Sequence, residues 1–182
     1  MQYDLIIIGG GPAGTGGAVY AARKRLKTLL IVPEWGGQSI VSETIFNWIG
    51  TPAISGNDLA DSFKKHVYAN AKTDQNPDST LEVKEGEKVV SVEKKDDGFM
   101  IKTESGTEFA TKTVLIASGS GRRKLEAQNA DRLEHRGLTY CASCDGPLFS
   151  GQDVVVIGGG NAGFESAAQL LAYCNSVTLL HR

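Results

Sequence analysis

The sequence predicts an α/β protein in which a parallel sheet with flanking helices is combined with an antiparallel β-meander and followed by a second, incomplete βαβ unit. An apolar strand, a triple-glycine turn and a helix of small residues follow one another near the start of the chain, and the same order recurs from residue 154. Between the repeats lie short segments separated by Asp-Asp-Gly and Glu-Ser-Gly. Strands followed by helices are typical of parallel sheets, and such turns are typical of antiparallel hairpins.

The first repeat is expected to form a strand, a helix and a second strand. Leu5–Ile8 is continuously apolar, as in a strand that is covered on both faces. Pro12 suits the first turn of a helix, where its missing N–H costs nothing, so we expect a helix over Ala13–Arg25. Thr28–Val32 is expected to be the second strand.

The middle of the chain is expected to contain a long loop, a helix and the meander. Residues 33–56 are punctuated by glycine and proline, which is typical of a functional loop. Asn57 or Asp58 can cap a helix that runs to about Asn70. Three antiparallel strands should follow, with turns at residues 96–98 and 104–106, and then Thr113–Ala117 as a further buried strand.

A connector rich in glycine and arginine, Gly119–Arg123, predicts a domain boundary. We expect residues 1–118 to form the first nucleotide-binding domain. Residues 119–182 should be the start of a second one, incomplete because the chain stops after its second strand.

Composition excludes several classes of protein. The 182 residues carry a net charge of −2, with a pI of about 5.9, so no basic surface for nucleic acid is expected. The run Leu5–Ile8 is far too short for a membrane span or a signal core. Three cysteines without a secretory signal favour a reducing, cytoplasmic location.

Each repeat carries a Gly-x-Gly-x-x-Gly turn of the Rossmann type, formed by Gly9, Gly11 and Gly14 and by Gly158, Gly160 and Gly163. In this motif the first glycine allows the tight turn, the second lets a pyrophosphate approach, and the third lets helix and strand pack closely. The helix N-terminus adds N–H groups and positive potential. We therefore expect two nucleotide sites, the alternative being purely structural turns.

The residues expected at the nucleotide ribose differ between the repeats. Glu34 lies about 20 residues beyond the first turn, where a carboxylate binds the ribose hydroxyls, although Pro33 precedes it. A solvated loop carboxylate is the alternative. The second repeat ends in His181 and Arg182 with no acid, and an arginine there can pair with the 2′-phosphate of NADP. A surface arginine is the alternative.

Cys141-Ala-Ser-Cys144 lies between the repeats and could form a reversible disulfide or half of a zinc site. A structural zinc site would need two more ligands. The remaining candidates are Cys174, His66, His135 and His181. They form no second short-spaced pair, so we predict a redox pair and no metal. Asp145 can exchange protons with the thiols, and it can also form a turn with Gly146 and Pro147.

Two nucleotide sites that flank a dithiol are typical of an electron-transfer flavoprotein. The chain resembles the low-molecular-weight thioredoxin reductase family, including the flavoprotein component of alkyl hydroperoxide reductase. The likeness is carried by residues 9–14, 36–38, 47–50, 117–119, 140–146 and 158–163, in family order. Cys144–Phe149 looks most like the peroxide-reductase branch, whereas His181-Arg182 looks more like the NADPH-using thioredoxin reductases.

The resemblance implies a homodimeric FAD enzyme in which electrons pass from NADPH to FAD, then to Cys141–Cys144, and finally to a thioredoxin-like or peroxiredoxin-linked protein disulfide. It implies that Cys144 faces the flavin, Cys141 attacks the partner and Asp145 supplies the proton. The residues implied for FAD are Gly9, Gly11, Pro12, Ala13, Gly14, Glu34, Gly37, Gln38, Asn47, Ala117, Ser118 and Gly119. Those implied for NADPH are Gly158, Gly160, Asn161, Ala162, Gly163 and Arg182.

Two departures from the family pattern leave alternatives open. Ser118 stands where threonine is usual, and the family's chain continues well beyond Arg182. We therefore expect a truncated chain that binds FAD weakly, with a marginal second unit that leaves one sheet face uncovered. The alternatives are a ferredoxin-linked or peroxiredoxin-linked reductase, or a flavin-binding fragment without activity.

Overall fold

The computed structural model describes residues 2–121, 123–134 and 136–181. The chain forms two compact units, one made of residues 1–44 and 54–121 and the other of residues 45–53 and 122–182. No helix in the described part of the chain is both long and apolar enough to cross a membrane. The domain boundary expected after residue 118 stays a prediction, because compactness does not show what each unit binds.

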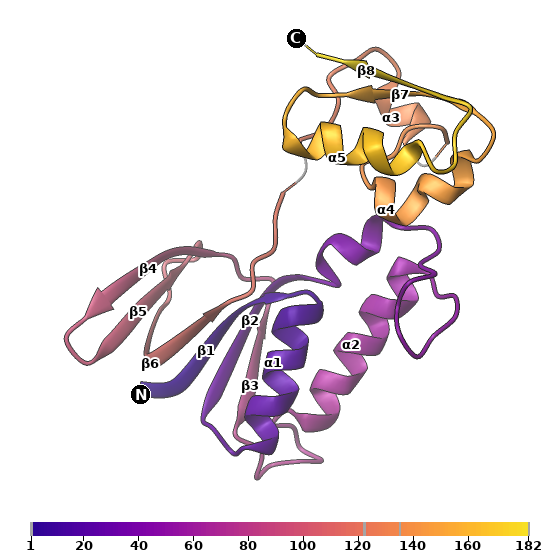
Figure 1. Ribbon diagram of the computed structural model, residues 1–182. Helices are drawn as coiled ribbons and strands as arrows, with labels where there is room; N and C mark the ends of the chain where they lie inside the picture. The colour runs from indigo at the N-terminus through magenta and orange to yellow at the C-terminus, as the bar shows by residue number, and fades with distance from the viewer. Residues whose placement is uncertain (1, 122, 135, 182) are drawn as a thin grey trace. The chain divides into compact units, whose positions relative to one another are not determined.

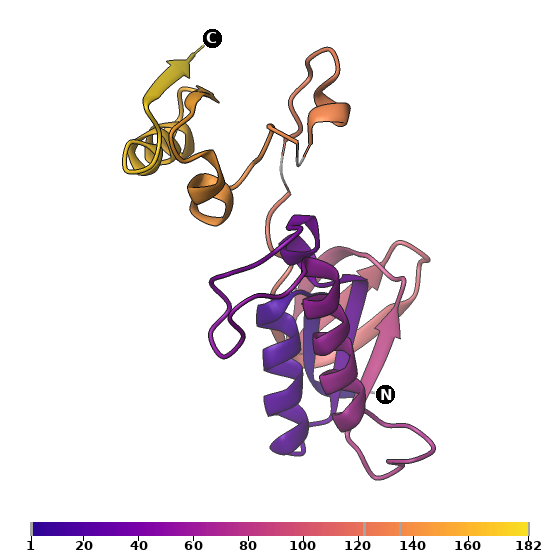
Figure 2. The same ribbon diagram turned by 90° about the vertical axis from the view of Figure 1, so that its right-hand side faces the viewer.

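The first unit is built on a six-stranded sheet in the order β3-β2-β1-β6-β5-β4. Its strands are β1 (Gln2–Gly10), β2 (Thr28–Trp35), β3 (Leu81–Glu85), β4 (Val89–Lys95), β5 (Gly98–Thr103) and β6 (Glu108–Ile116). The first three and β6 are parallel, whereas β4, β5 and β6 pair in antiparallel fashion. Helices α1 (Pro12–Arg23) and α2 (Gly56–Asn70) lie side by side over β1, β2 and β3, as both views show (Figures 1 and 2).

Both faces of β1 are buried, which explains its uninterrupted apolar sequence. Ile7 packs with residues of the two helices, whereas Ile6 and Ile8 pack on the opposite face with Ile101 of β5. Ile6, Ile7 and Ile101 have no exposed surface. The core therefore fixes the carboxyl end of β1, where the first glycine turn begins.

The structure corrects the expected division of the meander. Residues 108–116 form one strand, so Thr113–Ala117 is not a separate element. Residues 108–111 of β6 pair with β5, and residues 110–116 pair in parallel with β1. The expected burial of this segment is also wrong, since Leu115 is 39% exposed and Ile116 is 66% exposed. Leu115 lies on the face of α1 and α2, which lie mainly over the neighbouring strands, whereas Ile116 lies on the opposite face, beyond residues 108–111, where β6 pairs with β5.

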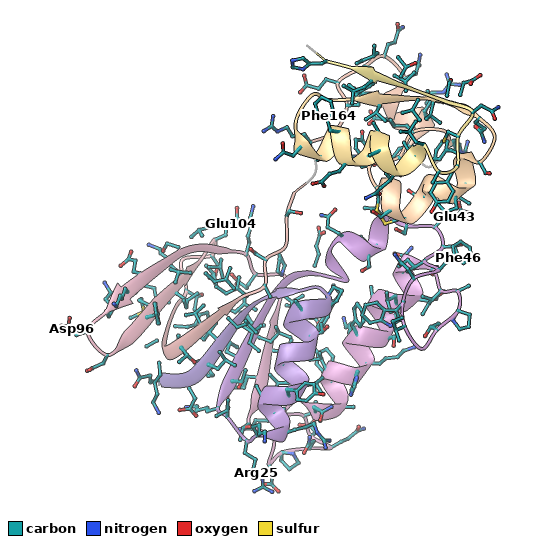
Figure 3. The ribbon with its side chains drawn as sticks, in the orientation of Figure 1. Arg25, Glu43, Phe46, Asp96, Glu104 and Phe164 are labelled. Atoms are coloured by element: carbon teal, nitrogen blue, oxygen red, sulfur yellow. A yellow bond between two sulfur atoms is a disulfide. The ribbon has the colours of Figure 1, made fainter. Side chains whose placement is uncertain are left out.

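The start of α2 also differs from the prediction, because Ser55 is its N-cap. Ser55 is extended, with φ −71° and ψ 153°, and its Oγ accepts a hydrogen bond from the backbone N–H of Asp58 at 3.0 Å. The same hydroxyl donates to Asp58 Oδ2 at 2.6 Å. Asp58 is therefore inside the first turn, and its carboxylate supports the cap. Figure 3 shows the side chains of this unit, with Asp96 at the β4–β5 turn and Arg25 just after α1.

The second unit contains the second βαβ repeat. Strands β7 (Asp153–Ile157) and β8 (Ser176–Leu180) form a two-stranded parallel sheet, connected by α5 (Asn161–Leu170). Two short helices, α3 (Ala130–Leu133) and α4 (Ala142–Asp145), and the 3₁₀ turn η2 (Gly146–Phe149) precede it. One sheet face stays open, as expected for a single βαβ unit, with Val155, Ile157 and Leu180 exposed by 53–58%.

Candidate functional site

The first glycine turn connects β1 to α1 with the geometry that its sequence predicts. Gly9 has φ +119°, and a methyl group at this position would lie 2.2 Å from the carbonyl oxygen of Ala117. A methyl group on Gly14 would lie 1.9 Å from the carbonyl oxygen of Gly9. The turn therefore closes only with glycine at both positions, and it brings the start of α1 against the end of β1.

The N-terminus of α1 can receive an anion. Gly11 is its N-cap and Pro12 its first residue, and the cap has no side-chain hydrogen bond. The first turn of this fully described helix, which includes Ala13, carries no acidic side chain. Its leading N–H groups thus lack a side-chain acceptor, and a phosphate is the ligand such a terminus favours. A pyrophosphate fits this open cradle.

Other predicted residues of the first unit gather at the same sheet edge. A methyl group on Gly11 would lie 3.7 Å from Cα of Gly37, at the start of the 3₁₀ turn η1 (Gly37–Val41). Gln38 Nε2 donates to the carbonyl of Ser120 at 2.7 Å. The N–H of Ala117 donates to the carbonyl of Ile8 at 2.9 Å, so β1 positions the start of residues 117–119. The predicted FAD residues Gly9, Gly11, Pro12, Ala13, Gly14, Gly37, Gln38, Ala117, Ser118 and Gly119 therefore lie around the carboxyl ends of β1 and β6.

Glu34 is placed within β2, which continues past Pro33 to Trp35 rather than ending at Val32. Its backbone carbonyl lies 2.7 Å from the position that a methyl group on Gly10 would occupy, and its side chain is exposed. The backbone of Glu34 is thus next to the glycine turn, and its exposed side chain is available for a ligand.

A polar cluster stabilises the neighbouring strand ends. Tyr68 Oη donates to Glu85 Oε1 at 2.6 Å, and Lys64 Nζ lies 3.1 Å from Glu85 Oε2. Burial, together with the Glu85 carboxylate, raises the pKa of Tyr68 to about 12. Burial opposes ionisation of Glu85, but hydrogen bonds from Tyr68 and Lys64 outweigh it and hold the pKa of that carboxyl below its usual range. This cluster fixes α2 against β3.

The second glycine turn repeats the geometry of the first. Gly158 has φ +131°, and a methyl group on Gly163 would lie 1.9 Å from the carbonyl oxygen of Gly158. Gly160 caps α5 without a side-chain hydrogen bond, and the described first turn, which includes Asn161 and Ala162, has no acidic side chain. A methyl group on Gly160 would meet no atom within 4 Å. A second pyrophosphate fits this terminus equally well.

Of the two residues that follow β8, the structure describes His181. A methyl group on Gly159 would lie 2.2 Å from Nδ1 of His181, so the imidazole is next to the second glycine turn. Arg182, predicted to bind a 2′-phosphate, lies outside the described residues. Asn47 belongs to the segment 45–53, which is part of the second unit, so its predicted approach to the flavin stays a prediction.

Cys141 and Cys144 form a disulfide at the first turn of α4, with their Cα atoms 5.3 Å apart. Both cysteines are half-buried, and the N–H of Cys144 donates to Sγ of Cys141 at 3.2 Å. Cys174 is a free thiol. No group of three or more His, Cys, Asp or Glu in the described residues could hold a metal ion. The two cysteines therefore form the disulfide that their spacing predicts, and their redox role stays a prediction.

Asp145 ends α4 and contacts a residue that the sequence did not single out. Thr139 Oγ1 donates to Asp145 Oδ2, and the N–H of Cys141 donates to Thr139 Oγ1 at 3.3 Å. Ser143 Oγ, between the cysteines, donates to Oε1 of Gln169 on α5 at 2.8 Å. Within the second unit, the segment that carries the disulfide is thus hydrogen-bonded both to Asp145 and to the helix of the second glycine turn.

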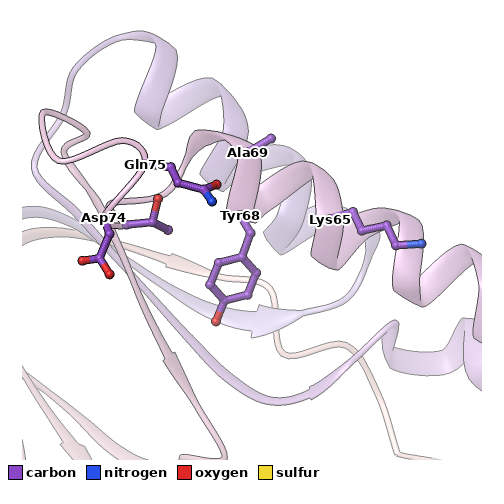
Figure 4. Close-up of a pocket in the computed structure, with 6 residues that line it drawn as sticks. Lys65, Tyr68, Ala69, Asp74 and Gln75 are labelled. Carbon is purple, nitrogen blue, oxygen red and sulfur yellow. The ribbon is translucent and has the colours of Figure 1, made fainter.

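A separate pocket of about 530 Å³ lies on the first unit (Figure 4). It lies between the C-terminal half of α2 and the loop that follows, and it is lined by Lys65, Tyr68, Ala69, Thr73, Asp74 and Gln75. None of these is a predicted site residue. The candidate site includes η1, which lies beside the first residue of α2, whereas the pocket lies at the other end of that helix. The pocket is therefore distinct from the candidate site.

Comparison with known proteins gives consistent relatives. The chain is 36% identical over 178 residues to the NADH dehydrogenase of Bacillus subtilis, an alignment that covers 98% of this chain and 33% of that protein. It is 37% identical over 177 residues to an alkyl hydroperoxide reductase component of Staphylococcus aureus, covering 97% and 33%. The thioredoxin reductase of Streptococcus pyogenes superimposes with a TM-score of 0.83 at 34% identity, covering 99% of this chain and 56% of that one.

The chain thus spans about a third of the length of these curated relatives and about half of the solved thioredoxin reductase. The superposition confirms the predicted α/β fold, in which a Rossmann-like domain precedes an incomplete second βαβ unit. Residues 3–182 match the pyridine nucleotide-disulphide oxidoreductase family. The resemblance expected from the cysteine pair and the two glycine turns is therefore confirmed, and the chain belongs to the pyridine nucleotide-disulphide oxidoreductase family.

Proposed function

We propose that this chain carries the flavin site and the redox dithiol of a pyridine nucleotide-dependent disulfide reductase. One observation carries the proposal: the same glycine turn occurs once before and once after the Cys141–Cys144 disulfide along the chain. In both turns the third glycine approaches the first equally closely. A bound flavin supplies two-electron reduction of a disulfide, and a bound nicotinamide supplies those electrons to the flavin.

The chain's own residues take distinct parts in this function. The N–H groups at the start of α1 bind the FAD pyrophosphate, and Glu34 binds the ribose of the same cofactor. Gln38, Asn47 and residues 117–119 contact the flavin. The N–H groups at the start of α5 bind the nucleotide pyrophosphate.

The dithiol then passes electrons to a protein disulfide of the thioredoxin-like or peroxiredoxin-linked kind. Cys144 exchanges electrons with the flavin, Cys141 attacks the partner, and Asp145 moves the proton. The likeness to the alkyl hydroperoxide reductase component and to thioredoxin reductase supports both kinds of partner. The working form is a homodimer in a reducing, cytoplasmic compartment.

NADPH is the proposed donor, since Arg182 can pair with a 2′-phosphate. The Bacillus subtilis relative, named NADH dehydrogenase, supports NADH as the competing donor. The discriminating variant is Arg182→Ala. We expect it to weaken the binding of NADPH at least tenfold and to leave that of NADH unchanged, whereas equal effects on both would remove the 2′-phosphate role.

Two alanine variants test the sites themselves. Alanine at Gly11 or Gly160 meets no protein atom closer than 3.7 Å, and both residues have extended backbone, so folding should be preserved. Each new methyl group would nevertheless occupy the space where a pyrophosphate approaches the turn. Gly16→Ala is the control: Gly16 lies in α1, the helix that Gly11 caps, and a methyl group on it would meet no atom within 4 Å.

We expect Gly11→Ala to weaken FAD binding at least tenfold, measured by quenching of flavin fluorescence. Gly160→Ala should retain FAD but lose the anaerobic bleaching of the flavin by NADPH or NADH. Gly16→Ala should behave as the unchanged chain. FAD binding that is the same in all three variants would contradict the flavin site, and bleaching that survives Gly160→Ala would contradict the nucleotide site.

A further inference from the structure

We propose that Thr139 is a positioning residue for Asp145, whose carboxylate it holds beside the dithiol for proton transfer during thiol–disulfide exchange. The inference rests on the acid–base role of Asp145 in the proposed function. It adds a residue whose contribution is made through another side chain.

The hydroxyl of Thr139 bridges the first cysteine and the acid. It accepts a hydrogen bond from the N–H of Cys141 at 3.3 Å and donates its own proton to Asp145 Oδ2. The N–H of Asp145 donates to the carbonyl of Cys141 at 3.0 Å, so the backbone closes the same loop. Thr139 and Asp145 are both half-buried. Hydrogen bonds through Thr139 thereby connect the carboxylate of Asp145 to Cys141, which carries one of the reacting sulfurs.

Without Thr139 this carboxylate has little to orient it. In the described part of the chain, the bond from Thr139 is the only hydrogen bond that a side chain gives to Asp145. Asp145 ends a helix of four residues, so that helix offers little rigidity of its own. Proton transfer requires the acid to lie within hydrogen-bond reach of the group it serves. Loss of the bridge should therefore slow exchange even though Asp145 remains present.

The exchange step conserves atoms, electrons and protons. Cys141 first loses its thiol proton to solvent, and the resulting thiolate attacks one sulfur of a disulfide RS–SR. The S–S bond breaks to give a mixed disulfide and RS⁻, which takes up a proton from solvent. Cys144 then gives its proton to Asp145 while its sulfur bonds to Cys141 Sγ and displaces the second RS⁻, which receives that proton. The dithiol loses two electrons and two protons, and the substrate becomes two RSH molecules.

The test needs neither flavin nor nucleotide. The chain is reduced with dithiothreitol, desalted and mixed with oxidised glutathione, and closure of the Cys141–Cys144 disulfide is followed by acid quench, alkylation and mass spectrometry. Thr139→Val removes the hydroxyl at nearly constant volume, and Thr139→Ala is a second variant that removes it without adding bulk. Thr139→Ser keeps the hydroxyl and is the matched control. Circular dichroism and the urea midpoint establish that each variant is folded.

We expect Thr139→Val and Thr139→Ala to slow closure about tenfold, part of the roughly 10²–10⁴-fold that acid–base catalysis contributes. Thr139→Ser should stay within about twofold of the unchanged chain. Asp145→Asn should be slower still, and adding Thr139→Val to it should change nothing further, because Thr139 acts only through Asp145. Unchanged closure in Thr139→Val, in Thr139→Ala or in Asp145→Asn, or additive effects in the double variant, would overturn the proposal.

The outcomes separate this inference from the proposed function. Non-additivity in a chain that fails to bind FAD would sustain the role of Thr139 and refute the flavin reductase. Additive effects of Thr139→Val and Asp145→Asn, in a chain whose flavin is bleached by nucleotide, would refute the role of Thr139 and sustain the flavin reductase.

Discussion

The third glycine of each turn gives the sharpest test of the site's construction. Alanine is normally favoured over glycine inside a helix by about 1 kcal/mol. At Gly14, however, the new methyl group would lie 1.9 Å from the carbonyl oxygen of Gly9, and 3.5 Å from Cβ of Ala117. The obstructing atom belongs to the backbone and cannot rotate away, so the overpacking cost falls at the upper end of roughly 1–3 kcal/mol. Gly14→Ala should therefore lose about 2 kcal/mol of unfolding free energy.

The control is Gly16→Ala, the same change two residues further along α1, where nothing lies within 4 Å. It should gain about 0.5–1 kcal/mol, the ordinary helix preference. The assay is urea unfolding followed by circular dichroism, together with thermal melting. A loss of about 2 kcal/mol corresponds to a fall in Tm of roughly 4–8 °C in a chain of this size. If Gly14→Ala proved as stable as Gly16→Ala, the close approach of α1 to β1 would be refuted.

The remaining predictions concern the α2 cap, two tyrosines with raised pKa values and the thiols. Ser55→Ala should lower the free energy of unfolding by about 1 kcal/mol, because it removes the acceptor for the N–H of Asp58, and Ser55→Asp should restore most of it; equal urea midpoints for all three chains would contradict the cap. Tyr3 and Tyr68 both have pKa values raised to about 12, mainly by burial. Because the folded chain then holds more protons than the unfolded chain, stability should fall as the pH rises from about 10 to 12. Phenolate absorbance should show two late-ionising tyrosines, and Tyr68→Phe should leave one. Under denaturing conditions without reductant, Ellman's reagent should detect one thiol, Cys174, and two more should appear after reduction; three thiols at the outset would contradict the disulfide.

Features set by short-range sequence were predictable. Both glycine turns, the apolar strand before each and the redox spacing of Cys141–Cys144 depend on residues within a few positions of one another. Their backbone requirements, such as the positive φ of Gly9 and Gly158, follow directly from the motif.

Features set by distant partners were not predictable. The sequence of β6 does not reveal that this strand pairs with β5 in antiparallel fashion along residues 108–111 and with β1 in parallel along residues 110–116. Ser55, Asn57 and Asp58 are all good caps, and the choice depends on a distant contact: the N–H of Gly56 donates to the carbonyl of Ser42 at 3.0 Å. Thr139 carries no motif signal, since only folding of the segment brings its hydroxyl to Asp145.

The central claim is that electrons from a pyridine nucleotide reach the Cys141–Cys144 disulfide through a flavin bound at the first glycine turn. The most direct measurement is the thiol content of the FAD-loaded chain after anaerobic addition of NADPH, determined by alkylation and mass spectrometry. The account predicts that modified cysteines rise from one, Cys174, to three, and only when FAD is present. A flavin that is bleached while the count stays at one, or a disulfide that opens equally well without FAD, would contradict it.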